Sequence, residues 1–110
     1  MTPVVPFVTA LRSRPGVVSV GGPGTPRITV RVELPEQWDT IACDVRAGAS
    51  VLELKRDALV EFGLGGAFVE DYLLKLRGFE VLGESRSVGE SGARDGSTFL
   101  LTYRRRRPVR

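Results

Sequence analysis

Residues 27–63 read RITVRVELPEQWDTIACDVRAGASVLELKRDALVEFG, and this stretch decides the fold. It opens with two runs in which apolar and polar residues alternate, at 27–34 and 40–46. Alternation with a period of two is typical of strands that bury one face of an antiparallel sheet. The connection between the runs starts at Pro35, which lacks the N–H that a central ladder needs. The two runs therefore predict a β-hairpin.

The second half of the stretch predicts one capped amphipathic helix. Ser50 and Glu53 fit a capping box, in which the Ser50 hydroxyl accepts a hydrogen bond from the Glu53 backbone N–H and the Glu53 side chain reaches back. Gly63 suits the left-handed residue that ends many helices. The apolar residues that recur at helical spacing are Val51, Leu54, Ala58, Leu59 and Phe62. The charged residues expected on the solvent side are Lys55, Arg56, Asp57 and Glu61.

Three more strands are predicted after the helix. They are 72–77, a very short 81–82 and a final 98–104, with a turn at 78–80 and a polar segment before the last strand. Phe68, in the loop after the helix, is expected to cover the lower edge of the core. We expect the first and last strands to pair in parallel at the centre of the sheet, with the helix across one face. The prediction is an α+β fold with a mixed sheet of four to five strands.

This order of elements, with these lengths, resembles the ubiquitin-like β-grasp superfamily. The matching segments are RITVRVEL and TIACDVR in the hairpin, SVLELKRDALVEFG in the helix, YLLKLRG after it, and ARDGSTFLLTYR at the closing strand. Ras-binding and FERM-type ubiquitin-like lobes share this pattern. The resemblance covers residues 27–104 and implies a β-grasp domain, a fold that serves many different tasks.

Two departures from the family bear on function. Conjugated modifiers of the family end in Gly-Gly, whereas this sequence has no Gly after Gly96. The family's recognition face is an apolar patch on the outer side of the sheet. The corresponding outward positions here are Lys75 and Thr102, with Leu73 and Leu100 nearby. The resemblance therefore implies a patch that is partly kept.

The segment before the hairpin allows two interpretations. Residues 1–26 contain five Pro and four Gly, which break long elements. One interpretation is a loosely attached arm or linker. The other is an extra short edge strand, with 17–20 as the candidate, or a segment that docks a partner. The domain is predicted to occupy 27–104, and 105–110 to form a basic tail.

The charges divide the chain into an acidic body and this basic tail. Residues 27–103 hold nine basic residues and all thirteen acidic ones, whereas residues 104–110 hold five Arg and no acid. The tail allows three interpretations: a solubilising end, docking to an acidic protein surface, and contact with nucleic acid or anionic lipid. Nucleic acid is disfavoured, because the acidic body offers no basic face with stacking aromatics.

The composition bounds the function. A chain of 110 residues suits one domain with one core. No apolar run approaches the length of about 18 residues that spans a bilayer, and a secretory signal is not expected. One Cys fits a reducing compartment, so a cytoplasmic protein is predicted. With no His, a Cys/His zinc site cannot be built within the chain and the commonest general base is missing. We therefore predict no enzymatic activity, no metal and no cofactor.

The thiol of Cys43, the indole of Trp38 and two pairs of carboxylates are the other side chains that could have a chemical or binding role. Cys43 alternates with core residues and is predicted to be buried and unreactive. Trp38 is expected either to fold back over the sheet edge or to be an exposed contact residue. The paired carboxylates at 70–71 and at Glu84 and Glu90 are predicted to be solvated loop charges.

The favoured function is a non-enzymatic ubiquitin-like module that binds a protein partner. Alternatives are a modifier with an unconventional or processed C-terminus, and an accessory binder of nucleic acid or an acidic surface. The residues predicted to contact the partner, on the outer sheet face and in the tail, are Arg31, Lys75, Leu100, Thr102, Arg104, Arg105, Arg106, Arg107 and Arg110.

Overall fold

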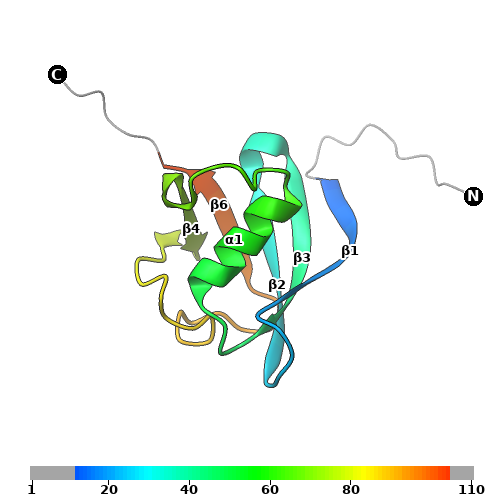
Figure 1. Ribbon diagram of the computed structural model, residues 1–110, viewed down its shortest axis with the longest axis vertical. Helices are drawn as coiled ribbons and strands as arrows, with labels where there is room; N and C mark the ends of the chain where they lie inside the picture. The colour runs from blue at the N-terminus through cyan, green and yellow to red at the C-terminus, as the bar shows by residue number, and fades with distance from the viewer. Residues whose placement is uncertain (1–11, 105–110) are drawn as a thin grey trace, which may run out of the picture.

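One mixed sheet with a helix across one face makes up the part of the computed structural model that is described, residues 12–104 (Figure 1). The order across the sheet is β1-β3-β2-β6-β4-β5. The strands are β1 (Arg12–Val20), β2 (Arg27–Leu34), β3 (Asp39–Arg46), β4 (Tyr72–Leu76), β5 (Phe79–Glu80) and β6 (Thr98–Tyr103). The helices are α1 (Val51–Glu61) and two short 3-10 turns, η1 (Pro35–Gln37) and η2 (Val69–Asp71).

The predicted α+β arrangement is confirmed, and its defining pair lies at the centre of the sheet. β2 runs parallel to β6, with Val32 opposite Phe99, and antiparallel to β3. β4 lies antiparallel to β6 on the other side. The sheet has six strands where four to five were predicted, because β1 adds an edge to the five strands predicted between residues 27 and 104.

The core lies between the sheet and α1, as the alternation predicts. The inward residues of the strands and of the apolar helix stripe are less than a tenth exposed, and they include Val30, Val32, Ile41, Cys43, Val45, Leu54, Ala58, Leu74, Leu76, Phe99 and Leu101. The capping box is confirmed, because the Glu53 N–H donates to Ser50 Oγ over 3.0 Å and the Ser50 N–H donates to Glu53 Oε1 over 3.3 Å. Gly63 follows the helix with a φ of 81°.

The short strand after β4 lies two residues earlier than predicted. A two-residue turn connects β4 to β5, and its residues Arg77 and Gly78 both have positive φ, at 54° and 84°. Turns of this kind match the twist of an antiparallel pair and close tight hairpins. Phe79 therefore pairs with Leu76, and the predicted turn at 78–80 and strand at 81–82 are wrong.

The burial of two side chains, Phe68 and Lys55, is the reverse of what the sequence predicts. Phe68 is 72% exposed and does not cover the core. Lys55, expected in solvent, is 1% exposed. Its Nζ donates to both carboxylate oxygens of Glu84, over 2.8 and 2.7 Å, and to the backbone oxygen of Tyr72 over 2.9 Å. The pair is possible in the interior because all three ammonium hydrogens have acceptors.

The described residues before the hairpin include an edge strand of the sheet. β1 pairs parallel with β3, and Val20 is fully buried opposite Val45. The loop from β1 to β2 passes close to the body: a Cβ on Gly21, whose φ is 85°, would lie 2.5 Å from that of Ala49. Glycine is therefore required at this position.

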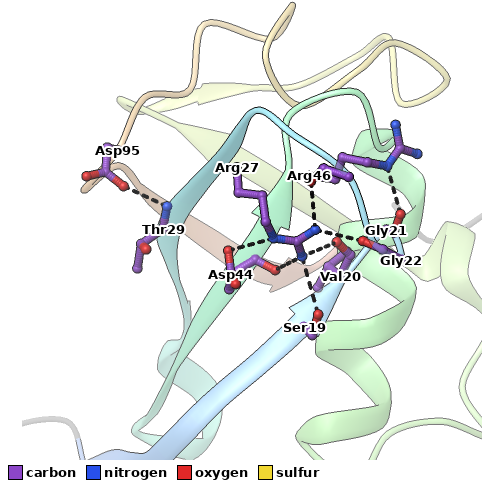
Figure 2. Close-up of polar contacts among 10 residues, drawn as sticks. Ser19, Val20, Gly21, Gly22, Arg27, Thr29, Asp44, Arg46 and Asp95 are labelled. Atoms are coloured by element: carbon purple, nitrogen blue, oxygen red, sulfur yellow. Dashed lines mark hydrogen bonds and ion pairs between the residues drawn. The ribbon is translucent and has the colours of Figure 1, made fainter.

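One guanidinium holds this loop in place (Figure 2). Arg27 Nε donates to Asp44 Oδ1 over 3.0 Å, and its Nη1 donates to the backbone oxygens of Gly22 and Gly24 over 2.7 and 3.1 Å. Its Nη2 donates to Ser19 Oγ and to the backbone oxygens of Val20 and Asp44, over 3.3, 3.4 and 3.1 Å. Arg46 Nε adds a bond to the Gly21 oxygen over 2.8 Å. The described part of this region is thus tied to the hairpin by charge-assisted hydrogen bonds.

Candidate protein-binding surface

The face of the sheet away from α1 carries the predicted contact residues. Strand register places Lys75 of β4 directly opposite Leu100 of β6, and Thr102 opposite Leu73. Lys75, Leu100 and Thr102 are half-buried, and Arg31 is exposed. Arg31 lies opposite Thr98, one outward position away from Leu100 along the sheet. The structure therefore brings all four predicted residues onto one surface, which we call the outer sheet face.

Sequence reasoning missed the two acidic residues that flank Leu100 and Lys75 on this face. Glu33 lies opposite Leu100 on β2, and Glu80 lies opposite Lys75 on β5. The alternation in residues 27–34 already placed Glu33 on the outward side, but its neighbour is known only once β2 and β6 are paired. Across the sheet from β2 to β5, the outer sheet face thus presents an acidic, an apolar, a basic and again an acidic side chain: Glu33, Leu100, Lys75 and Glu80.

Arg104, the last residue of the predicted domain, is held by contacts with β5 and η2. Its Nη2 forms an ion pair with Glu80 Oε2 over 2.8 Å, and its backbone N–H donates to the Asp71 oxygen over 2.6 Å. The register places the outward residue Leu73 between the two ends of this ion pair. Leu73 is 9% exposed, so the apolar patch expected there is smaller than the family pattern implies. Arg105, Arg106, Arg107 and Arg110 lie outside the described residues.

Two tyrosines and a carboxylate lie at the end of the sheet where β6 finishes, and alternation along β4 and β6 puts both tyrosines on the core side, opposite to the outer sheet face. The rings of Tyr72 and Tyr103 meet edge to face, with centroids 5.3 Å apart and an interplanar angle of 81°. The Tyr103 N–H donates to Glu36 Oε1 over 3.2 Å. Burial, and then the charge of Glu36, raises the pKa of the Tyr72 phenol. Trp38 ends η1 with a φ of 53° and is 63% exposed, so the structure favours the exposed of its two predicted positions.

The one thiol of the chain is unsuited to catalysis. Cys43 is fully buried, as predicted, and burial, followed by the charges of Asp57 and Glu61, raises the pKa of its thiol to about 12. A thiol with such a pKa is not a nucleophile at neutral pH. Among residues 12–104, no group of three His, Cys, Asp or Glu side chains could hold a metal ion. No helix in the same range is long and apolar enough to cross a membrane.

The prediction of a solvated loop charge is wrong for Glu84, whereas Glu90 is exposed, as predicted. Glu84 binds the buried Lys55. Glu90 Oε1 accepts from the Ser87 N–H over 3.0 Å, and the Glu90 N–H donates to Ser87 Oγ over 3.0 Å. Hydrogen bonds of the Glu90 carboxylate with the Ser87 backbone, and then with the Ser87 side chain, lower the pKa of the Glu90 carboxyl. Both carboxylates therefore shape the segment between β5 and β6.

Comparisons with known proteins find similarity in structure alone. No protein-family model and no curated protein sequence matches the chain. The ubiquitin-like domain of an Arabidopsis thaliana protein is 17% identical, with 78% of this chain and 86% of that chain covered and a TM-score of 0.61. Ubiquitin from Caldiarchaeum subterraneum is 14% identical, with 76% and 98% covered and a TM-score of 0.61.

A designed protein gives the same result. It is based on human erythrocytic ubiquitin as a template, is 25% identical, and matches with a TM-score of 0.60 over 76% of this chain and 99% of its own. The alignments thus cover nearly the whole of the ubiquitin-like structures and leave part of this chain outside. Together with the parallel β2–β6 pair and the helix across the sheet, they show that this chain has the ubiquitin-like β-grasp fold.

Proposed function

We propose that the chain is a non-enzymatic interaction module that binds a partner protein through its outer sheet face. The observation that carries the proposal is the adjacency of Lys75 and Leu100 on neighbouring strands, with Arg31 and Thr102 on the same face. This face lies opposite α1 and the core, so a partner can bind it without any change in the fold. Sites of this kind are rigid because their residues stand on paired strands.

The chemistry of the face defines the partner's surface. Leu100 provides apolar area between the charges of Lys75 and Glu33. A partner that buries Leu100 must offer an apolar side chain at its centre and a carboxylate opposite Lys75. Interfaces of this type gain most of their affinity from the central apolar contact, and the surrounding charges set orientation and association rate.

The tail extends this surface in the proposal. The Arg104–Glu80 ion pair places the last described residue beside β4 and β5, and residues 105–110 follow it in the sequence. Their four further arginines would add attraction for an acidic partner surface, which falls with increasing salt.

The test is a pull-down from the native host followed by affinity measurement with the captured partner. Lys75→Glu and Leu100→Ala should each weaken binding about tenfold or more, and removal of residues 105–110 should raise the dissociation constant mainly at low salt. Arg56→Glu, a charge reversal on the exposed side of α1, is the matched control and should leave affinity unchanged. Retention of every partner by both Lys75→Glu and the tail deletion would exclude the proposal.

A further inference from the structure

A groove runs beside the turn between β4 and β5, at the edge of the sheet farthest from β1. It encloses about 490 Å³, and Leu76 and Val81 contribute its better-buried apolar lining. Phe79 and Leu82 also line it, and they are 78% and 81% exposed. No other large apolar side chain between residues 16 and 104 is as exposed as these two. The groove therefore concentrates apolar surface that the fold itself does not bury.

The charge on the same groove is unbalanced. Its two arginines, Arg77 and Arg86, are exposed and form no ion pair with a carboxylate of residues 12–104. Its two acidic residues have partners: Glu80 binds Arg104 over 2.8 Å, and Glu90 accepts from the Ser87 N–H over 3.0 Å and also interacts with the charge of Arg86. Because Arg104 neutralises Glu80, the two arginines of the groove share one remaining carboxylate, Glu90, and an excess of positive charge lies beside the two exposed apolar side chains.

The groove is formed in advance of any binding. The turn at Arg77 and Gly78 is fixed by its left-handed backbone, and Arg77 Nη2 reaches the Gly92 oxygen over 3.4 Å. On the other side, Val81 N–H donates to the Leu74 oxygen over 2.8 Å, which continues the pairing beyond β5. A preformed groove reduces the ordering cost that a flexible ligand must overcome on binding.

We infer that this groove binds a linear segment of a partner protein in which a large apolar side chain is flanked by Asp or Glu. The apolar side chain would cover Phe79 and Leu82, and the carboxylates would pair with Arg77 and Arg86. Guanidinium–carboxylate pairs are directional, so they orient the segment along the groove. The occupant is not the tail of a second copy, because residues 104–110 hold five Arg and no acid. This surface shares only Glu80 with the outer sheet face, and the two tests change different residues, so the two proposals stand or fall independently.

The experiment selects ligands from a phage-displayed library of random linear peptides, with the full chain as bait. Peptides that combine Phe, Leu or Trp with neighbouring Asp or Glu should be enriched. A fluorescent version of the best peptide should bind Phe79→Ala at least roughly 30-fold more weakly. Phe68→Ala is the matched control, because Phe68 is 72% exposed but does not line the groove. Arg77→Glu should weaken binding about tenfold, whereas Arg94→Glu, an exposed arginine outside the groove, should not.

Several results would overturn the inference. These are enrichment of no peptides or of basic ones, and equal affinity of Phe79→Ala and Phe68→Ala for the selected peptide. A wild-type dimer in sedimentation that Phe79→Ala makes monomeric would assign the groove to a second copy instead. Because Phe79 and Phe68 are exposed, their substitution should leave the thermal unfolding temperature at the wild-type value. An unchanged unfolding temperature then shows that lost affinity reflects lost contacts with the peptide.

Discussion

Arg27 and Lys55 each tie a loop segment to the rest of the fold, but the two side chains bind different sets of partners. Arg27 ties the loop after β1 to the hairpin through a mixture of backbone oxygens and Asp44, with its side chain 22% exposed. Lys55 ties the segment after β5 to α1 through Glu84 and one backbone oxygen, with its side chain 2% exposed. The guanidinium distributes its donors over many partners, whereas the ammonium depends on one carboxylate. The buried site is therefore more sensitive to the loss of a single partner.

The largest expected effect comes from Glu84→Gln. The substitution leaves the Lys55 ammonium buried without a compensating charge, so we expect the free energy of unfolding to fall by about 3 kcal/mol. Chemical denaturation at neutral pH measures this loss. The double variant Lys55→Met with Glu84→Gln removes the ammonium charge as well. It should recover most of the lost free energy of unfolding, with a remaining loss of about 1 kcal/mol for the unpaired Tyr72 oxygen. A double variant as unstable as Glu84→Gln would contradict this role of the ion pair.

Arg27→Ala should have a smaller effect, about 2 kcal/mol, because several of the freed backbone oxygens can bind water at the surface. Denaturation again measures the loss. Arg31→Ala on the same strand is the control, since Arg31 is exposed, and should change stability by less than about 0.5 kcal/mol. Labelling of the Cys43 thiol then reports local opening of the β1 edge, since β1 pairs with β3 beside Cys43. If the Cys43 thiol of Arg27→Ala is labelled no faster than the variant unfolds globally, the β1 edge does not open separately.

The smallest expected effect concerns Glu90 and depends on pH. Because the folded pKa of Glu90 is lowered, its stabilising contribution is present above the ordinary value of 4.5 and is lost as pH falls through the folded pKa. Wild type should therefore lose more thermal stability than Glu90→Gln between neutral pH and pH of about 3. Ser87→Ala removes one of the two hydrogen bonds and should reduce the difference. Parallel pH profiles for wild type and Glu90→Gln would show that this carboxylate does not stabilise the segment.

The elements that the sequence predicts well are those with strong local patterns. The hairpin and α1 follow from alternation and the Ser50–Glu53 box, which act within a few residues. Lys55 shows the limit: it lies four residues after Val51 and three before Ala58, on the buried side of the helix. Its burial requires Glu84, 29 residues away, and that partner is known only from the folded chain.

The candidate site, too, has a part that the sequence predicts and a part that only the folded chain reveals. Alternation along β4 and β6 suffices to place Lys75 and Leu100 on the outward side. The neighbours Glu33 and Glu80 depend on strand register, which a single sequence does not specify. The exposure of Phe79 and Leu82 is equally hidden, because an apolar side chain looks the same in a sequence whether the fold buries it or exposes it.

The parallel pairing of β2 with β6 also determines when the fold can be completed. Val32 meets Phe99 from roughly 70 residues further along the chain, so loop closure is costly and folding should be slow for the chain's size. During synthesis, β1 can already cover one edge of the β2–β3 hairpin. The other edge of β2 stays open until the last strand leaves the ribosome. That interval is when the nascent chain is most exposed to aggregation.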